Sequence, residues 1–243
     1  MAQALRSTNC GIAAIRPRHV FNLMKPQAGN TVFQAILPTI NDGRGGLTFL
    51  ETAIVVALLK ITNPKAIFEF GTFMGATTIT LAMNSPDSAR ITTLDIAPEE
   101  LAKIQLKDAS AKSAAEEDNA IRDLSAQQSG IIIDQADSAA KAKITRIWQN
   151  SLTLDTEQRG YRRNFDFIFV DGGHDYRTVK NDTEKALEMM RSDHSIIVWH
   201  DFNSALHAGV KQYVSEFAKD RRVMHVGDTM IAFYCPGIEQ SFS

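Results

Sequence analysis

Residues 66–78 constrain the fold more than any other part of the sequence. A short apolar run ends on Glu69 and Phe70, Gly71 and Gly75 flank a tight turn, and the residues that follow have helical spacing. This order predicts a buried strand, a glycine turn and the start of a helix. In an open α/β sheet, such a turn at the carboxyl end of a strand is where nucleotide-like ligands bind. We therefore expect a ligand site here.

Apolar runs alternate with helical patterns along the chain, which predicts a parallel sheet with right-handed crossovers. Strands are expected at residues 66–70, 90–95, 143–149, 165–170 and 195–199, and helices at about 47–61, 76–83, 176–191 and 204–219. The last two strands, 222–226 and 229–235, are joined by Gly227-Asp228, a link too short for a parallel crossover. The predicted fold class is α/β: a Rossmann-like seven-stranded, mostly parallel sheet closed by an antiparallel C-terminal hairpin, with helices on both faces.

The chain is expected to comprise an N-terminal arm, residues 1–46, and one domain, residues 47–243, with an insertion at 97–142. Residues 32–37 of the arm have the pattern of a short helix, and the arm is expected to pack on the domain or on a second subunit. The insertion is too long for a simple crossover, and it predicts two weakly amphipathic helices at about 98–108 and 113–127. A lid, a subunit contact and a solvated insertion all fit this pattern.

Composition excludes several classes of partner and location. The net charge is −2, so no basic excess indicates nucleic acid or an anionic membrane as a partner. The only two cysteines, Cys10 and Cys235, are too few for a disulfide framework. No apolar stretch approaches the roughly 18 residues of a membrane span, and no apolar signal core opens the sequence. We expect a cytoplasmic protein.

The glycine turn has features that disfavour a dinucleotide. A dinucleotide site requires Gly-x-Gly-x-x-Gly, because the middle glycine lets the pyrophosphate approach the backbone. Phe73 occupies that middle position, and Glu69 precedes the turn, where its charge repels a phosphate. Both features suit a phosphate-free ligand with a cationic end, such as S-adenosylmethionine. The alternative is an ordinary strand–helix turn with an incidental acid.

Two later strand ends extend this candidate cofactor site. Asp95 ends the second strand of the domain, 20 residues after Gly75, a spacing at which an acid accepts hydrogen bonds from ribose hydroxyls. Asn150 and Ser151 follow the next strand and are candidates for the adenine side, although both are ordinary loop residues. A solvated acid that caps a strand is the alternative for Asp95.

The most specific chemistry follows the fourth and fifth strands of the domain. Asp171 ends one, and His200 and Asp201 end the other, so all three lie at the same sheet edge as Gly71. They are candidates to bind a divalent cation or a substrate hydroxyl, and a histidine ligand shifts the choice toward manganese, iron or zinc. His174 is the candidate base for a hydroxyl nucleophile, because imidazole titrates near neutral pH.

Helix capping is the competing explanation for polar residues at these strand ends. We expect Asp175 and Asn203 to cap the helices that follow them, and we assign ligation or catalysis to Asp171, His174, His200 and Asp201. No role is assigned to the remaining histidines, His19, His194, His207 and His225.

Four motifs in order resemble the class I S-adenosylmethionine-dependent methyltransferases, closest to the small-molecule O-methyltransferase branch with catechol and macrocin O-methyltransferases. The motifs are Glu69-Phe70-Gly71-Thr72-Phe73-Met74-Gly75, Thr93-Leu94-Asp95-Ile96, Val170-Asp171-Gly172-Gly173-His174-Asp175-Tyr176 and Val198-Trp199-His200-Asp201-Phe202. The resemblance covers about residues 47–235. It implies a cofactor site at Glu69, Gly71, Gly75 and Asp95, a metal site at Asp171, His200 and Asp201, and a base at His174. This chain departs from the metal-dependent members by having His200 where an oxygen ligand is usual.

Together these patterns predict an S-adenosylmethionine-dependent methyltransferase acting on a hydroxyl oxygen of a small molecule, directly or with a divalent cation such as magnesium or manganese. The cofactor-binding residues are expected to be Glu69, Gly71, Thr72, Phe73, Gly75, Asp95, Ile96, Asn150, Ser151 and Asp171. The expected partners are the hydroxyl acceptor and further copies of the chain. The alternatives are a nicotinamide-dependent oxidoreductase and a non-catalytic binding protein on the same fold.

Overall fold

The computed structural model describes residues 10–28, 34–37, 45–101, 103 and 112–237, and within them the chain forms an eight-stranded sheet. The strands are β1 (Gly11–Ile15), β2 (Ala66–Phe70), β3 (Arg90–Asp95), β4 (Ile144–Trp148), β5 (Phe167–Val170), β6 (Ile196–Trp199), β7 (Arg222–Val226) and β8 (Ala232–Tyr234). Their order is β1-β7-β8-β6-β5-β2-β3-β4, and β8 is antiparallel to both of its neighbours. The remaining pairs are parallel.

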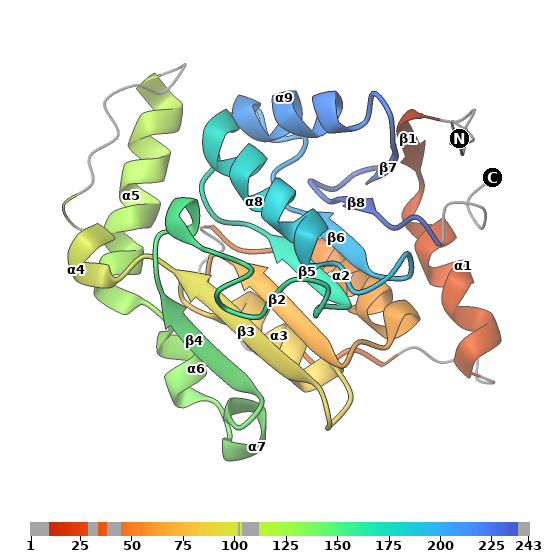
Figure 1. Ribbon diagram of the computed structural model, residues 1–243, viewed down its shortest axis with the longest axis horizontal. Coiled ribbons are helices and arrows are strands. Elements are labelled where there is room, and N and C mark those ends of the chain that lie inside the picture. Colours follow the sequence, from red (N-terminus) through yellow and green to blue (C-terminus); the bar gives the residue numbers. More distant parts are fainter. Residues whose placement is uncertain (1–9, 29–33, 38–44, 102, 104–111, 238–243) are drawn as a thin grey trace.

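Helices cover both faces of the sheet (Figure 1). They are α1 (Pro17–Ala28), α2 (Phe49–Thr62), α3 (Ala76–Asn84), α4 (Pro98–Leu101), α5 (Lys112–Gln128), α6 (Ile131–Gln135), α7 (Ser138–Lys141), α8 (Tyr176–Met189) and α9 (Ala208–Phe217), with a 3₁₀ turn at Ser151–Thr153. Residues of α1, α2 and α3 pack on one face, and residues of α8 and α9 pack on the other. Within the described residues, no helix is long and apolar enough to cross a membrane.

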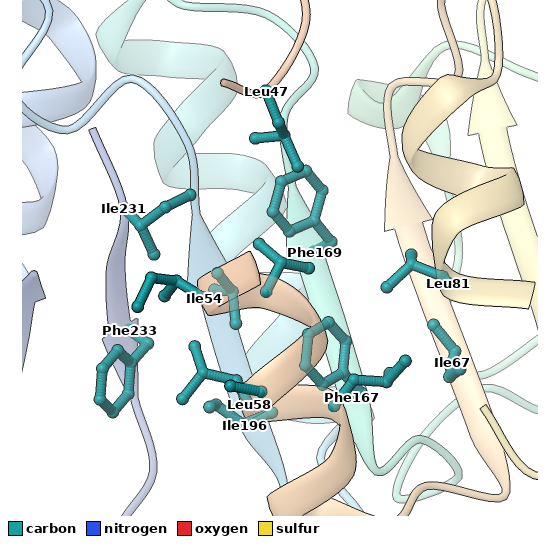
Figure 2. Close-up of a cluster of buried hydrophobic side chains, with 14 of the residues drawn as sticks. Leu47, Ile54, Leu58, Ile67, Leu81, Phe167, Phe169, Ile196, Ile231 and Phe233 are labelled. Carbon is teal, nitrogen blue, oxygen red and sulfur yellow. The ribbon is translucent and has the colours of Figure 1, made fainter. Parts of the chain in front are cut away.

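The core explains why the central strands read as continuous apolar runs. Alternate residues of β5 serve opposite faces: Phe167 and Phe169 join the cluster around α2, whereas Ile168 and Val170 join the cluster around α8 and α9. A strand buried on both faces has no polar side, which is typical of parallel sheets. Figure 2 shows the first cluster, with Ile54 and Leu58 of α2 lying against β5 and β6.

Helix α2 is fixed at both ends by local chemistry. Thr48 and Glu51 form a capping box, and Asn63 ends the helix in the left-handed conformation, with φ of 44°. The middle of the helix is buried on all sides, since residues 54–59 are all buried. The oxygen Oε1 of Glu51 also accepts a hydrogen bond from the Met230 amide at 2.8 Å, which ties the helix to the loop before β8.

The fold class is confirmed, with one correction to the number of strands. The sheet has eight strands rather than seven, because Gly11–Ile15 of the predicted arm pairs in parallel with β7. This strand carries only five residues, and glycine and alanine supply three of them, so it has little strand character by itself. The predicted helix at residues 32–37 falls partly outside the described residues, and residues 34–37 are not helical.

The turn after β2 brings the ends of β2 and β5 into direct contact. Gly71 has φ of +90°, and a Cβ added there would lie 2.1 Å from the carbonyl oxygen of Asp171. Gly75 has φ of +89°, and its Cβ would lie 2.5 Å from Cγ1 of Ile133. Only glycine satisfies both constraints, so the turn follows from the packing as well as from the backbone dihedrals.

We predict that Gly71→Ala destabilises the protein far more than Gly160→Ala. Gly160 also has a positive φ, +69°, but no atom lies within 4 Å of its added Cβ. The control therefore measures the left-handed backbone alone, about 1–2 kcal/mol, whereas Gly71→Ala adds displacement of the Asp171 carbonyl. Urea unfolding at 25 °C compares the two free energies. Equal losses for the two variants would contradict the close approach.

Candidate active site

Asp95 holds the turn that follows β2. Its oxygen Oδ2 accepts hydrogen bonds from the backbone amides of Thr72 and Phe73 at 3.1 and 2.9 Å, and Oδ1 accepts one from Ile96 at 2.8 Å. Phe73, at the middle position of the motif, has φ of 49°, a left-handed conformation that the two Asp95 contacts help to maintain. Asp95 is thus placed at the turn, where the sequence predicted it.

Glu69 lies beneath the turn instead of on its surface. Its side chain is buried, and Oε2 accepts a hydrogen bond from the hydroxyl of Thr78 in α3. Burial, opposed by hydrogen bonds from Thr78 and Thr93, raises the pKa of Glu69 to about 8. At this pKa the carboxyl group is mostly protonated at pH 7, and its predicted contact with a cationic ligand end stays a prediction.

Asn150 and Ser151 begin the loop after β4, as expected. Asn150 caps the 3₁₀ turn by accepting from the Leu152 amide at 2.9 Å. The carbonyl of Ser151 accepts from Asn181 and Lys185 of α8, and burial raises the pKa of the neighbouring Asp182 to about 6. The loop is thereby fixed to α8, on the side of the sheet where β2 and β3 end.

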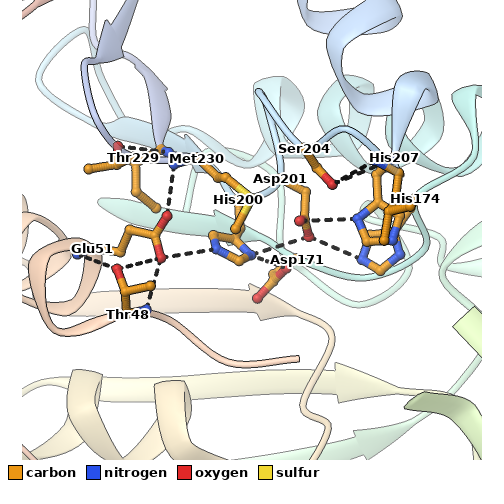
Figure 3. A network of polar contacts seen from close by, with 12 residues as sticks. Thr48, Glu51, Asp171, His174, His200, Asp201, Ser204, His207, Thr229 and Met230 are labelled. Carbon is orange, nitrogen blue, oxygen red and sulfur yellow. Dashed lines mark hydrogen bonds and ion pairs between the residues drawn. The ribbon is translucent and has the colours of Figure 1, made fainter. Parts of the chain in front are cut away.

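Asp171, His200 and Asp201 meet at the ends of β5 and β6, as the sequence predicted (Figure 3). The nitrogen Nδ1 of His200 lies 3.3 Å from Oδ1 of Asp171 and 3.2 Å from Oδ2 of Asp201. On the other side of the ring, Nε2 lies 3.6 Å from Oε2 of Glu51. The ring of His200 is 5% exposed, so the three acids surround a buried imidazole.

His174 and His207 form a second group beside Asp201 (Figure 3). Their rings stack with centroids 3.8 Å apart and planes 20° apart. The oxygen Oδ1 of Asp118, from α5, lies 2.8 Å from Nδ1 of His174 and 3.1 Å from Nε2 of His207. Asp201 contacts the opposite nitrogens, Nε2 of His174 at 3.3 Å and Nδ1 of His207 at 3.1 Å. Two stacked imidazoles thus lie between two carboxylates.

The carboxylates control protonation throughout this cluster. Burial disfavours the charged imidazole, but hydrogen bonds with Asp118 and Asp201 outweigh it and raise the pKa of His174 to about 10. Burial also opposes the charged forms of His200 and His207, but the carboxylates beside them raise both pKa values. Burial opposes ionisation of Asp118 and Asp201, yet their contacts with the histidines lower both pKa values. In this arrangement His174 holds its proton near pH 7.

Asp201 adopts an unusual backbone conformation, with φ of 58°. This left-handed region is uncommon for residues other than glycine, although aspartate and asparagine enter it more readily than most. The conformation turns the chain directly after β6, and His200 and Asp201 both reach the cluster from it. Such strain is typical of functional sites.

The structure adds three residues that sequence reasoning missed: Glu51, Asp118 and His207. Glu51 belongs to a capping box and has no link in sequence to the strand ends. Asp118 lies in the polar insertion, where one acid among many gives no signal. Helix α9 begins at Ala208 and not near Asn203. His207, seven residues after His200, therefore directly precedes the helix. Asn203 therefore does not cap it, whereas Asp175 caps α8 as predicted.

The donor set at Asp171, His200 and Asp201 fits a divalent cation. Their candidate ligand atoms all lie within 4.8 Å of one another, and Nδ1 of the buried His200 faces both carboxylates, at 3.3 and 3.2 Å. Two carboxylates and one imidazole suit manganese, iron or zinc better than magnesium, which prefers oxygen ligands.

Comparison with known proteins places this geometry in context. A sequence model of a methyltransferase domain matches residues 68–202, more than half of the chain. Methyltransferase PaMTH1 of Podospora anserina, solved with bound SAH, superposes with a TM-score of 0.51 at 15% identity, covering 93% of this chain and 88% of that one. Cofactor-bound Rv0187 from MTB gives 0.51 at 15% identity, covering 90% and 88%. Both share the fold of this chain. No curated protein matches the sequence.

We predict that Glu69→Gln removes a pH-dependent loss of stability. The folded-state pKa of about 8 lies above the unfolded value of 4.5, so the folded protein keeps a proton that the unfolded chain releases. Stability therefore falls as pH rises from about 4.5 to 8, by up to roughly 1.4 kcal/mol per pH unit. Urea unfolding at pH 5, 6, 7 and 8 should show the variant gaining on the wild type as pH rises.

Glu99→Gln on α4 is the matched control, because Glu99 is exposed and the same change there should leave the wild-type pH dependence intact. A Glu69→Gln curve parallel to the wild type at all four pH values would mean that Glu69 ionises in the folded protein with an ordinary pKa.

Proposed function

The chain belongs to the methyltransferase-domain family that matches residues 68–202, and from this premise we propose that it transfers the methyl group of S-adenosylmethionine to a hydroxyl oxygen of a small molecule. The observation that carries the proposal is the contact between Gly71 and the Asp171 carbonyl, because it sets the cofactor turn beside the polar cluster. A methyl donor on the turn and a hydroxyl at the cluster would then be neighbours, and such positioning supplies much of the acceleration of a displacement reaction.

The proposed donor site runs from the turn toward α4. Asp95 retains acceptor capacity beyond its three backbone contacts, since a carboxylate has about four lone-pair sites, and this capacity suits a ribose hydroxyl. An open cleft of about 480 Å³ lies just beyond, lined by Pro98, Glu99, Asp123, Ala126 and Gln127. We place the adenosine between Asp95 and this cleft, with Ile96, Asn150 and Ser151 on its flank and the methionine portion over Gly71, Thr72, Phe73 and Gly75.

The proposed acceptor site is the cluster of Asp171, His200 and Asp201, which would hold a divalent cation. Such an ion lowers the pKa of a bound hydroxyl and fixes its orientation. The protein's part is to present the acceptor oxygen in line with the donor methyl and to take its proton. Of the three side chains, Asp171 is the most accessible, at 18% exposure against 5% for His200 and 10% for Asp201.

The proton acceptor needs a free lone pair. His174, the base predicted from sequence, meets a carboxylate at each ring nitrogen and keeps its proton near pH 7. We therefore propose that Asp171 takes the acceptor proton, and that His174 positions Asp201.

A nicotinamide-dependent reaction is disfavoured by the family and by Phe73 in place of the middle glycine. The cytoplasmic location, the homo-oligomer, the division into arm and domain, and the absence of nucleic-acid or membrane partners stay predictions.

We predict that S-adenosylmethionine binds in calorimetric titration and that Asp95→Asn weakens its affinity about 10- to 100-fold. The variant loses charge-assisted hydrogen bonds to the ribose, each worth roughly 1.5–3 kcal/mol. Asp220→Asn is the control. Asp220 is largely exposed and lies just before the start of β7, at the end of that strand away from the proposed donor site. NAD⁺ should not bind. An absence of heat with millimolar S-adenosylmethionine, or equal affinity in the two variants, would refute the donor site.

We predict that Asp171→Asn lowers kcat at least 100-fold with tritium-labelled donor and a panel of phenols and sugars, because removal of a general base typically costs 10²–10⁴. His174→Gln should cost less, since an amide still donates to Asp201. Affinity for S-adenosylmethionine is measured alongside to separate binding from chemistry. A larger loss for His174→Gln, with the acidic limb of the pH profile gone, would return the role of base to His174.

A further inference from the structure

The proposed methyl transfer uses His174 only to position Asp201, and it gives no role to His207, which stacks on His174. Both rings lie between Asp118 and Asp201, and the four residues come from four separate segments: α5, the loop after β5, the loop after β6 and the residue before α9. Asp118, His174 and His207 each offer a ligand atom, and these atoms lie within 4.8 Å of one another. The group is therefore a possible coordination set of its own, apart from Asp171 and His200.

His207 shows that the protein side chains alone do not satisfy this group. Its ring is 8% exposed, and a carboxylate oxygen lies 3.1 Å from each nitrogen. Even so, neither nitrogen makes a well-directed hydrogen bond, because neither oxygen lies where a ring N–H would point. A buried imidazole without a partner is costly, so a further group that accepts its lone pair would stabilise it.

The charges around the rings also suit a cation. Asp118 and Asp201 both face the same pair of imidazoles. One divalent cation held by two neutral imidazoles brings a charge of +2 to these two carboxylates and places it on a single centre.

We propose that Asp118, His174 and His207 bind a divalent transition-metal ion, distinct from the cation proposed at Asp171, His200 and Asp201. The ligand atoms are Oδ1 of Asp118, Nδ1 of His174 and Nε2 of His207. Ligands about 2.0–2.1 Å from one ion lie roughly 2.9–3.4 Å apart. The distances of 2.8 and 3.1 Å from Asp118 to the two nitrogens are close to this range, and the stacked rings would tilt toward each other to direct both lone pairs at one ion. Two imidazoles and one carboxylate suit zinc, iron or manganese.

Asp201 would orient both histidine ligands. Its two oxygens face the nitrogens that do not reach Asp118, at 3.3 Å for His174 and 3.1 Å for His207. A metal-bound histidine commonly donates its other N–H to a carboxylate, which fixes the tautomer and the direction of the ring. Asp201 would therefore serve the two ions in different ways, as a ligand to one and as the orienting carboxylate of the other. The second ion would also fasten α5 to the loops after β5 and β6.

The test counts Zn²⁺ ions in protein that is stripped by a chelator, re-equilibrated and measured by plasma mass spectrometry, without S-adenosylmethionine or an acceptor. Asp171→Asn removes a ligand of the first cation and should still bind one Zn²⁺. Adding Asp118→Asn, or separately His207→Gln, should lower the affinity for that Zn²⁺ ion. The decrease should exceed the roughly 10- to 100-fold that loss of an outer-sphere partner costs. Asp123→Asn, an exposed acid on the same helix, is the matched control and should leave Zn²⁺ binding unchanged.

Circular dichroism and melting curves establish that each variant is folded, and two different ligand variants guard against a single misfolded one. If folded Asp171→Asn binds no Zn²⁺, or if both double variants bind it as tightly as Asp171→Asn, the second site is refuted. Because the measurement involves neither methyl donor nor acceptor, failure of the methyl-transfer proposal leaves its outcome unchanged.

Discussion

The structure depends on the close approach of β2 and β5 at their carboxyl ends. The Asp171 carbonyl occupies the space that any side chain at position 71 would need, so the chain must turn sharply there without a Cβ. This contact places the turn, the Asp95 carboxylate that holds it and the cluster at the ends of β5 and β6 along one edge. The layered core keeps the edge in place, because both faces of β5 are buried under helices. The ligand-binding edge is thus a product of packing between strands.

Opposite charges alternate through the polar cluster from Glu51 to Asp118. Each histidine lies between acids. Glu51, Asp118 and Asp201 each contact residues from more than one segment of the chain. Burial penalises these charges, and contacts with the histidines lower the pKa values of Asp118 and Asp201, while contacts with these two acids raise the pKa of His174. Removing one partner would leave another buried charge without compensation. The cluster therefore behaves as a unit, and we expect substitutions within it to be far from additive.

Sequence patterns predicted the parts of the molecule that local chemistry determines. The bounds of β2, β3 and β7 were right to the residue, because buried strands read as apolar runs between turn residues. The four motifs predicted a methyltransferase family, which the domain match confirms. Asp171, His200 and Asp201 were predictable as neighbours because the carboxyl ends of parallel strands meet at one edge. Residues outside that rule were missed: Glu51 approaches through a helix, Asp118 through the insertion, and His207 through a helix start that came later than the pattern suggested.

The eighth strand has a consequence for how the protein is made. Gly11 of β1 pairs with Arg222 of β7, so 211 residues separate the two partners along the chain. During synthesis β1 leaves the ribosome early, yet its partner emerges only after almost all of the sheet has been translated. Contacts between such distant residues are slow to form, and an unpaired strand edge invites association with other chains in the meantime. Because β8 lies between β7 and β6 and follows β7 in the sequence, this border of the sheet is complete only after β8 has been made, and a nascent chain is most exposed to mispairing there.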